Sequence, residues 1–336
     1  MAPLSSIAMS AYTDLVRLLK DDAVSGVKGK PLLKQRGNRA YWYAARRVGS
    51  EMCFSYIGED GNETRARIDR IEALRATAKE RQAERSRLVR LLRAEGMTPT
   101  DRATGSILSA MANAGTFRLG GTLVGTNAFR LYEGELGIRL PLGGMANTGD
   151  IDIDQFEKLS IALEDKVAPS LAETFSTLKF DPLPGFDQRR TWRWAQGGSG
   201  QLVEFLTPAF GEETIRDLPA LGVSAQALNY LNYLIAEPIH AAAIYRSGVL
   251  VQIPRPERFA IHKLIIADRR RDGEGSLRAS KDREQAAFLI KAMAEDRPDD
   301  LRRAYIAARD VGPRWREHIS NSLKRMHDTM DILGST

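Results

Sequence analysis

The sequence predicts an α+β fold: a mixed sheet flanked by helices, with an N-terminal β-hairpin/helix module and a helical C-terminal domain. Segments with strand-like alternation occur around 40–57 and recur at intervals between 116 and 253. Longer segments with helical spacing separate them, and the pattern after residue 258 is almost wholly helical. We therefore expect three domains, at 1–100, 101–255 and 256–336.

Composition supports a globular intracellular protein. The chain has 336 residues and 43% apolar content, enough for a sizeable core. Its single cysteine, Cys53, excludes a disulfide framework and any cysteine-based zinc site. No stretch approaches the roughly 18 apolar residues of a membrane span, and the first 20 residues lack a long apolar segment. We expect a cytoplasmic protein with no membrane partner.

Positive charge is concentrated in the first third of the chain. Residues 1–100 carry 19 Lys and Arg against 12 Asp and Glu, a net charge of +7, whereas the remainder has a net charge of −1. A basic module attached to a nearly neutral body indicates a polyanionic partner. A basic surface that serves only solubility explains the same numbers.

The first 100 residues divide into a short helix, a basic loop, a hairpin and a long helix. The helix is expected over 11–20 and the loop over 26–37. Residues 40–57 form the hairpin, with its turn at Gly49-Ser50. The charged segment 65–95 has a sparse apolar stripe at helical spacing.

The predicted hairpin combines aromatic rings with cations, as proteins that bind single-stranded nucleic acid do. Ordinary strand propensity accounts for the same rings, and both interpretations stay open. The residues concerned are Tyr41, Trp42, Tyr43, Phe54, Tyr56, Lys34, Arg36, Arg39, Arg46 and Arg47.

The predicted elements of the middle domain alternate between helix and strand. Helices are expected at 103–114 and 122–132, and helical sequence follows the strand 148–154 as far as residue 177, with a break near Pro169. Further strands are expected at 116–119, 191–194, 202–206 and 248–253, and mostly helical sequence at 213–245. The final helices break near 273–276, Pro298 and Pro313.

Three carboxylates occupy alternate positions of one predicted strand. Asp150, Asp152 and Asp154 therefore share a face, while Ile151 and Ile153 point into the core. Crowded hard oxygens suit Mg²⁺ or Mn²⁺, although a solvated strand end gives the same pattern. A calcium-binding EF-hand loop is excluded, because its glycine and glutamate positions hold Gln155 and Ile161.

Gly120-Gly121 stands between a predicted strand and a predicted helix. Such a turn offers backbone N–H groups and a helix N-terminus to phosphate, but ordinary turns also use glycine. Two better-known phosphate-binding patterns, the P-loop and the dinucleotide fingerprint, are absent from the sequence.

Together these motifs resemble the DNA polymerase β-type nucleotidyltransferase superfamily. The resemblance rests on Leu119-Gly120-Gly121-Thr122, on Asp150-Ile151-Asp152-Ile153, and on a later strand with one acid, Glu204. It implies that Gly120, Gly121 and Thr122 hold the triphosphate and that Asp150, Asp152 and Glu204 bind two divalent cations. Independently, a lone glutamate in an apolar strand is costly to bury unless it ligates or pairs.

The C-terminal third is similar to the helical segment of abortive-infection toxin nucleotidyltransferases, and the region 116–290 resembles a poorly characterised bacterial branch of the superfamily. The similarity lies in Phe259–Leu264, Arg269-Arg270-Arg271 and Lys281–Gln285. It implies phosphate binding by Lys263, Arg270 and Lys281. On one helix, Lys263 and Arg270 are seven residues apart and share a face. Asp282 is expected either to cap the next helix or to orient a cation, and His262 to be packed or at the surface rather than catalytic.

The resemblance implies a metal-dependent enzyme that transfers NMP from an NTP to an acceptor hydroxyl, with Glu204 also able to take the hydroxyl proton. The basic module favours RNA, and the toxin-like segment makes the tRNA 3′ end the first choice of acceptor and an antitoxin a possible partner. The alternative is a catalytically silent fold that binds RNA or protein. Two features depart from the family: the inserted loop at 134–147 and the extra acid Asp154, expected near a helix start.

Overall fold

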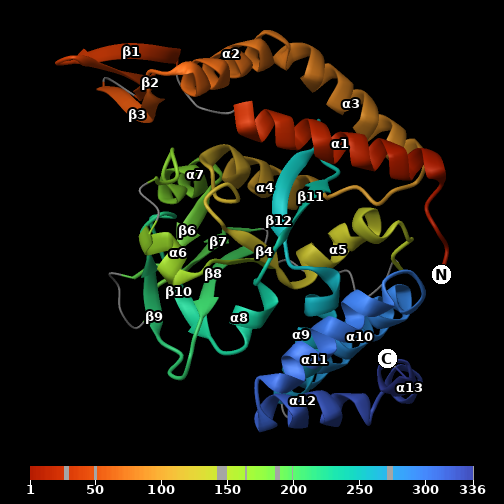
Figure 1. The fold of residues 1–336 in the computed structure, drawn as a ribbon. Coiled ribbons are helices and arrows are strands. Elements are labelled where there is room, and N and C mark those ends of the chain that lie inside the picture. Colours follow the sequence, from red (N-terminus) through yellow and green to blue (C-terminus); the bar gives the residue numbers. More distant parts are fainter. Residues whose placement is uncertain are drawn as a thin grey trace.

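The computed structural model describes residues 1–25, 30–48, 51–141, 150–162, 165–185, 190–198, 200–270 and 275–335. Their strands form three sheets, of which the largest, the central sheet, has seven strands (Figure 1). Helices pack beside this sheet, and a second, three-stranded sheet formed by residues 30–59 lies apart from it. The predicted α+β fold with a mixed sheet flanked by helices is confirmed.

The central sheet follows the strand order β4-β5-β8-β10-β9. These strands are β4 (Thr122–Val124), β5 (Asp150–Asp154), β8 (Leu202–Pro208), β10 (Val223–Leu228) and β9 (Ile215–Leu218). Two further strands, β7 (Arg193–Gln196) and β6 (Phe180–Pro182), join it through pairing of β7 with the first half of β8. Because β5 is parallel to β8 and antiparallel to β4, the beginnings of β5 and β8 meet the end of β4.

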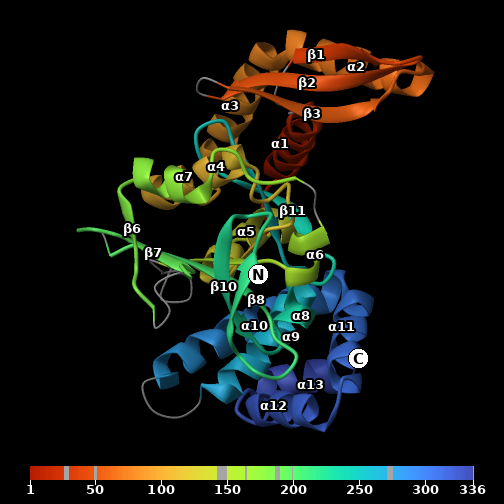
Figure 2. The same cartoon turned by 90° about the vertical axis from the view of Figure 1, so that its left-hand side faces the viewer.

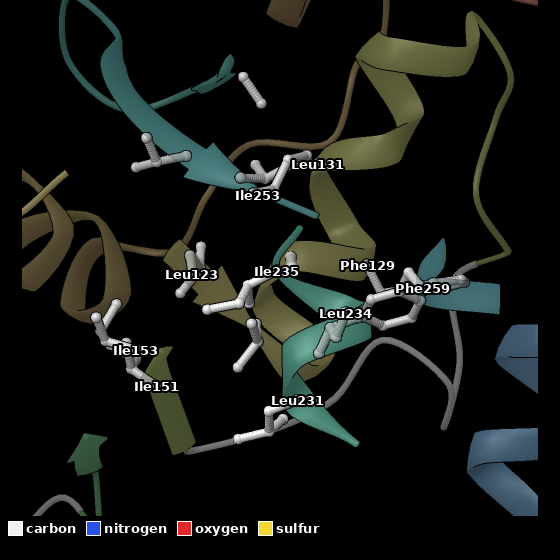
Figure 3. Packing of buried hydrophobic residues seen from close by; sticks show 14 of the residues in the cluster. Leu123, Phe129, Leu131, Ile151, Ile153, Leu231, Leu234, Ile235, Ile253 and Phe259 are labelled. Carbon is white, nitrogen blue, oxygen red and sulfur yellow. The ribbon is translucent and has the colours of Figure 1, made fainter. Parts of the chain in front are cut away.

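The alternation predicted for the aspartate strand is present in β5. Ile151 and Ile153 are both fully buried and pack near Leu123 of β4 (Figure 3). The helix after β4, α5 (Gly125–Leu136), adds Phe129, which stacks on Phe259 with ring centroids 6.3 Å apart. Burial of apolar faces therefore fixes the register that sends the carboxylates to the opposite face of the sheet.

Helices surround the central sheet. They are α4 (Arg102–Ala114), α6 (Glu157–Ala162), α7 (Leu171–Thr177) and α8 (Leu231–Leu234). Asp101 caps α4 by accepting a hydrogen bond from the Thr104 backbone N–H at 2.9 Å. A hairpin of β11 (Ile239–Ala243) and β12 (Val249–Ile253) packs beside β4.

The C-terminal helices are α9 (Pro256–Arg269), α10 (Ser276–Asp296), α11 (Pro298–Asp310), α12 (Pro313–Leu323) and α13 (His327–Ser335). The central helix, α9, contacts α10, α11 and α12. One cluster of buried apolar residues runs from Ile107 to Leu333 and so crosses the predicted boundary at residue 255. The three-domain division itself stays a prediction.

The N-terminal region contains α1 (Ser6–Ser25), β1 (Lys30–Arg36), β2 (Arg39–Val48), β3 (Glu51–Glu59), α2 (Asn62–Ala76) and α3 (Ala78–Ala94). Helices α1 and α3 share a second apolar cluster with Ala242 and Ile244. This cluster joins them to β11, whereas the sheet β1-β2-β3 lies farther out beside α2 (Figure 2).

Several predicted elements are wrong. Residues 30–36 of the expected basic loop form β1, which pairs along its whole length with β2. The expected helix 65–95 is two helices that break at Thr77. The segment 213–245 contains the strands β9, β10 and β11 and one short helix, α8. Pairing within sheets overrides the helix preference of the Ala and Leu residues in these strands.

The predicted hairpin over 40–57 is confirmed by β2 and β3, which pair antiparallel. Its turn at Gly49-Ser50 lies outside the described residues, as do residues 142–147 of the predicted inserted loop. The first residues of that predicted loop, 134–136, belong to helix α5 instead. Among the helices that the structure describes, none is both long enough and apolar enough to cross a membrane.

Candidate active site

Three of the predicted site carboxylates come together on β5 and β8. In the parallel register Asp152 lies directly opposite Glu204, and Asp150 lies one side-chain repeat away on the same face of β5. All three residues are half-buried. The cross-strand pairing places two acids about 5 Å apart at their Cα atoms, an arrangement in which like charges repel.

The pKa of Asp152 reports this crowding. Burial, followed by the charges of Glu204 and Asp150, raises the pKa of Asp152 from 3.8 to about 7. Burial and Asp150 also raise the pKa of Glu204, against the opposing effect of Arg193 and Arg278. An acid cluster that resists ionisation in this way is typical of a functional site.

The turn that precedes α5 differs from the predicted one. Residues 116–119 form turns rather than a strand, and Thr122 belongs to β4 rather than to a helix. Gly120 and Gly121 therefore precede the strand, where Gly121 N–H donates to the Thr116 carbonyl oxygen at 2.9 Å. Thr122 pairs with Asp154, at the end of β5 away from Asp150.

The junction between strand and helix is instead Val124-Gly125-Thr126, and sequence reasoning missed it. Gly125 has φ +68°, and a Cβ atom there would lie 2.5 Å from Oδ2 of Asp152. Asn127 Nδ2 donates to the Asp150 carbonyl oxygen at 2.7 Å, which ties the first turn of α5 to β5. We therefore move the proposed phosphate-binding turn from Gly120, Gly121 and Thr122 to Gly125 and Thr126.

Replacing Gly125 with alanine is expected to destabilise the fold by roughly 1–3 kcal/mol and to lower activity at least tenfold. The new Cβ would displace the Asp152 carboxylate, and the alanine would have to adopt the left-handed backbone conformation of Gly125. Urea unfolding and steady-state kinetics measure the two effects.

The control for this variant is Gly222→Ala. Gly222 has φ +65°, but a Cβ there would meet no heavy atom within 4 Å. The Gly222→Ala variant therefore has the same kind of backbone strain without a contact to Asp152, and its activity should stay near that of the wild type. Equal loss of activity in both variants would show that strain alone explains the effect.

Two predicted phosphate-binding cations, Lys263 and Arg270, are joined by one buried acid. Lys263 Nζ lies 2.5 Å from Oδ1 of Asp282, and an Arg270 guanidinium nitrogen lies 3.0 Å from Oδ2. Burial acts to raise the pKa of Asp282, but Lys263 and Arg270 outweigh it and hold that pKa below its usual value. Of the two predicted roles for Asp282, it orients cations rather than capping a helix, because α10 already begins at Ser276.

The cations of α9 and α10 and the carboxylates of the sheet shift one another's pKa values. Lys263 and Arg270 both lower the pKa of Asp152 against its other neighbours. Lys281 has its pKa lowered by burial and then by Lys263, while Asp282 and Asp150 oppose this. The structure thus brings the predicted acids and cations into one electrostatic cluster.

Three further polar residues belong to this site. Two of them, Arg193 and Arg278, had no signal in the sequence, and the third, Gln285, was given no role although it lies in the family-like series Lys281–Gln285. Arg193 lies opposite Glu204 on the neighbouring strand β7, and Arg278 acts on both Glu204 and Lys281. Gln285 is fully buried, and its amide nitrogen lies 3.5 Å from the Thr126 hydroxyl. They are recognised as site residues only from the folded structure, which places them next to the acids and to Thr126.

The donor set of this cluster fits a hard divalent cation. Three carboxylates share one face of the sheet, and burial makes their joint ionisation unfavourable without a compensating charge. Within the described ranges, no group of three or more acidic, His or Cys side chains is already arranged around one point as a metal site. A bound ion would therefore have to draw Asp150, Asp152 and Glu204 together.

Asp154 and His262 lie in the core rather than in the cluster. Asp154 is fully buried at the end of β5, three residues before α6 begins at Glu157, and burial raises its pKa well above the usual value. His262 is 6% exposed, and burial lowers its pKa to about 3. Of its two predicted placements, packed or at the surface, the structure shows the packed one.

A separate polar cavity of about 500 Å³ lies where α9 ends beside α12. Its lining includes Tyr230, Asp268 and His318, with the His318 ring nitrogen Nδ1 2.8 Å from the Asp268 carboxylate. None of the site carboxylates lines it. The geometry of the carboxylates therefore defines the candidate active site.

A protein-family model described as nucleotidyltransferase matches residues 102–310. The match extends from α4 to the end of α11 and includes every carboxylate and cation of the site. The N-terminal module lies outside it. No curated protein and no solved structure matches the chain.

Proposed function

Because the chain belongs to this nucleotidyltransferase family, we propose that it transfers NMP from an NTP to the hydroxyl of an RNA acceptor with the help of Mg²⁺ or Mn²⁺. The observation that supports the proposal is the pairing of Asp152 with Glu204, beside Asp150 and opposite the cations of α9. Acids alone would suit a metal site, and cations alone a phosphate site. Their combination suits chemistry on a metal–triphosphate complex.

Asp150, Asp152 and Glu204 would hold the divalent cation. Bound there, Mg²⁺ or Mn²⁺ would neutralise the triphosphate oxygens and stabilise charge on the leaving group. The resemblance suggests two ions, and the three carboxylates offer six oxygens for them. Removal of divalent ions with EDTA is expected to abolish transfer and added Mg²⁺ or Mn²⁺ to restore it.

Gly125 and Thr126 would bind the phosphates at the N-terminus of α5, a 12-residue helix whose first backbone N–H groups point out of the helix. Lys263 and Arg270, oriented by Asp282, would face the β- and γ-phosphates together with Lys281. Fixed cations at this position would stabilise the departing pyrophosphate.

In the proposed reaction the acceptor hydroxyl oxygen forms a bond to the α-phosphorus. The bond that breaks joins this phosphorus to the oxygen that bridges the α- and β-phosphates. The products are an acceptor esterified with NMP and pyrophosphate. Glu204 would take the hydroxyl proton, since burial and Asp150 raise its pKa and make it a better base than an exposed glutamate.

We further propose that the acceptor is the 3′ end of tRNA and that the protein acts as a toxin held in check by an antitoxin. The basic first third of the chain and the toxin-like cation series support this choice. Expression in bacteria should then arrest growth, and Asp150→Ala should relieve the arrest. Harmless expression of an active wild-type enzyme would rule out the toxin role.

The experiment that tests the proposed activity incubates the protein with each α-labelled NTP, Mg²⁺ or Mn²⁺ and total bacterial RNA. An Asp150→Ala/Asp152→Ala double variant serves as the matched control. Label in a tRNA-sized band with the wild type only is the expected result. Absence of label in RNA and protein alike, with RNA still bound, would favour the catalytically silent binding fold.

A further inference from the structure

The two faces of the sheet β1-β2-β3 differ in composition. Side chains alternate along a strand, and residues paired across an antiparallel ladder share a face. Leu32 pairs with Tyr43 and Lys34 with Tyr41, and these four side chains therefore lie on one face. By the same rule Lys30 joins them, whereas Leu33 and Trp42 lie on the other face.

Helix α2 covers the face that carries Trp42. Ala44, on this face, is fully buried, as are Ile68 and Ile71 of α2. A Cβ atom on Gly58, which pairs with Trp42, would lie 2.8 Å from the Thr64 hydroxyl at the start of α2. The Trp42 indole N–H donates to Asp60 at 2.9 Å. The part of this face around Trp42 and Ala44 is therefore used for packing, whereas Leu33 on the edge strand β1 is 45% exposed.

The opposite face, which we name the tyrosine face, carries Lys30, Leu32, Lys34, Tyr41 and Tyr43. Arg39 and Glu59 share this face and form an ion pair with each other at 3.7 Å. Leu32 is 42% exposed, and Lys30 is exposed as well. Lys34 Nζ lies 5.4 Å from the centre of the Tyr43 ring. Among the described elements, only α2 makes more than slight contact with this sheet, and the sheet lies at the outer end of the molecule (Figures 1 and 2).

Charge and ring spacing on the tyrosine face match a single nucleic-acid strand. Tyr41 and Tyr43 are two residues apart on β2, which separates their rings by roughly 7 Å and leaves room for one base on each. Lys30 and Lys34 stand on the neighbouring strand, where phosphates of such a strand would pass. A protein partner would be expected to need more apolar area than Leu32 and Ala45, the aliphatic side chains that the structure describes on this face, supply.

We propose that the tyrosine face binds single-stranded RNA, with bases stacked on Tyr41 and Tyr43 and phosphates bound by Lys30 and Lys34. Stacking requires unpaired bases, whose ring faces are accessible only outside a duplex. This inference rests on the proposed function, because it gives the acceptor RNA a docking surface outside the catalytic cluster. The family match ends before this surface, so the module would add RNA recognition to a nucleotidyltransferase core.

The test measures binding of a fluorescent 12-nucleotide RNA to the full-length protein by anisotropy, without NTP. Tyr41→Ala/Tyr43→Ala should weaken binding roughly tenfold or more, and Tyr41→Phe/Tyr43→Phe should restore it, because phenylalanine keeps the stacking ring. Lys30→Ala/Lys34→Ala should weaken binding and flatten its dependence on salt. Circular dichroism confirms that each variant is folded.

Arg67→Ala/Arg70→Ala is the matched control for charge. Both arginines are exposed on α2, and their removal takes away the same two charges without touching the tyrosine face. It should change the affinity less than the Lys30/Lys34 pair does. DNA of the same sequence and duplex RNA complete the comparison, and duplex RNA should bind more weakly than the single strand.

Three results would overturn the inference: no binding of single-stranded RNA, wild-type affinity in the folded Tyr41→Ala/Tyr43→Ala variant, or equal affinity for duplex RNA. Stronger binding of DNA than of RNA would reassign the surface to single-stranded DNA and overturn it too. Asp152→Asn should leave RNA affinity unchanged. Intact binding without label transfer by the wild type would therefore sink the proposed enzyme and leave this inference standing.

Discussion

Asp152→Asn is expected to lower the turnover number of nucleotidyl transfer by roughly a thousandfold, the largest effect of any single substitution. The amide keeps the size of the side chain but removes, directly opposite Glu204, a negative charge of the proposed metal site. Measurement of kcat at saturating NTP and Mg²⁺ isolates this loss from weaker binding.

The fold should tolerate the change. Burial, Glu204 and Asp150 already disfavour a charged Asp152, raising its pKa to about 7, and the neutral amide removes that repulsion. We expect the metal-free variant to melt at or above the wild-type temperature and to gain less stability from added Mg²⁺. A variant that melts much lower would instead make Asp152 a structural residue.

Asp282→Ala is expected to destabilise the protein by roughly 3–5 kcal/mol, because it leaves the buried Lys263 ammonium without its acid. Arg270 is 45% exposed in its side chain and contributes less, since water screens its charge. The KM for NTP should rise as well, since both cations lose the group that orients them. Urea unfolding and kinetics at low temperature provide the two measurements.

The pH dependence of this effect has a defined sign. Because the pKa of Asp282 is lower in the folded protein than in the unfolded chain, its ion pairs stabilise the fold above about pH 4 and lose that effect as pH falls through the folded pKa. The stability difference between wild type and Asp282→Ala should therefore shrink in acid.

Asp300→Ala is the control, because Asp300 forms an exposed ion pair with Arg303 within α11. Its loss should cost less than about 1 kcal/mol. Asp282→Asn should retain part of the stability through its amide oxygen. Unchanged unfolding of Asp282→Ala would contradict the proposed role of the buried acid.

The acids of the site could be predicted because strand periodicity alone decides which side chains share a face. Asp150 and Asp152 alternate with two isoleucines, which places both acids on the face opposite the core. Glu204 is the lone acid of an apolar strand, which marks it as the third candidate. Their direct pairing across β5 and β8 depends on the register, which no local pattern specifies.

The sequence favours Gly120-Gly121 over Gly125 as the proposed phosphate-binding turn because a glycine pair is a stronger turn signal than a lone glycine. The glycine pair lies before β4, a strand of only three residues. Gly125 lies after that strand, and only its closeness to the Asp152 carboxylate in the folded chain indicates a role in the site. The segment 213–245 is long and rich in Ala, which predicts a helix, but many of its Ala residues lie in the strands β10 and β11. Buried Ala225 and Ala227 fit there because β10 is enclosed by β8 and β9.

The measurement that tests the central claim most directly compares α-labelled with γ-labelled NTP in otherwise identical reactions with bacterial RNA. Transfer of NMP predicts that the α-label enters the acceptor and that the γ-label leaves as pyrophosphate, with both signals absent in Asp152→Asn. Entry of the γ-label into the acceptor would contradict the account, because the same cluster would then transfer a phosphoryl group rather than a nucleotide.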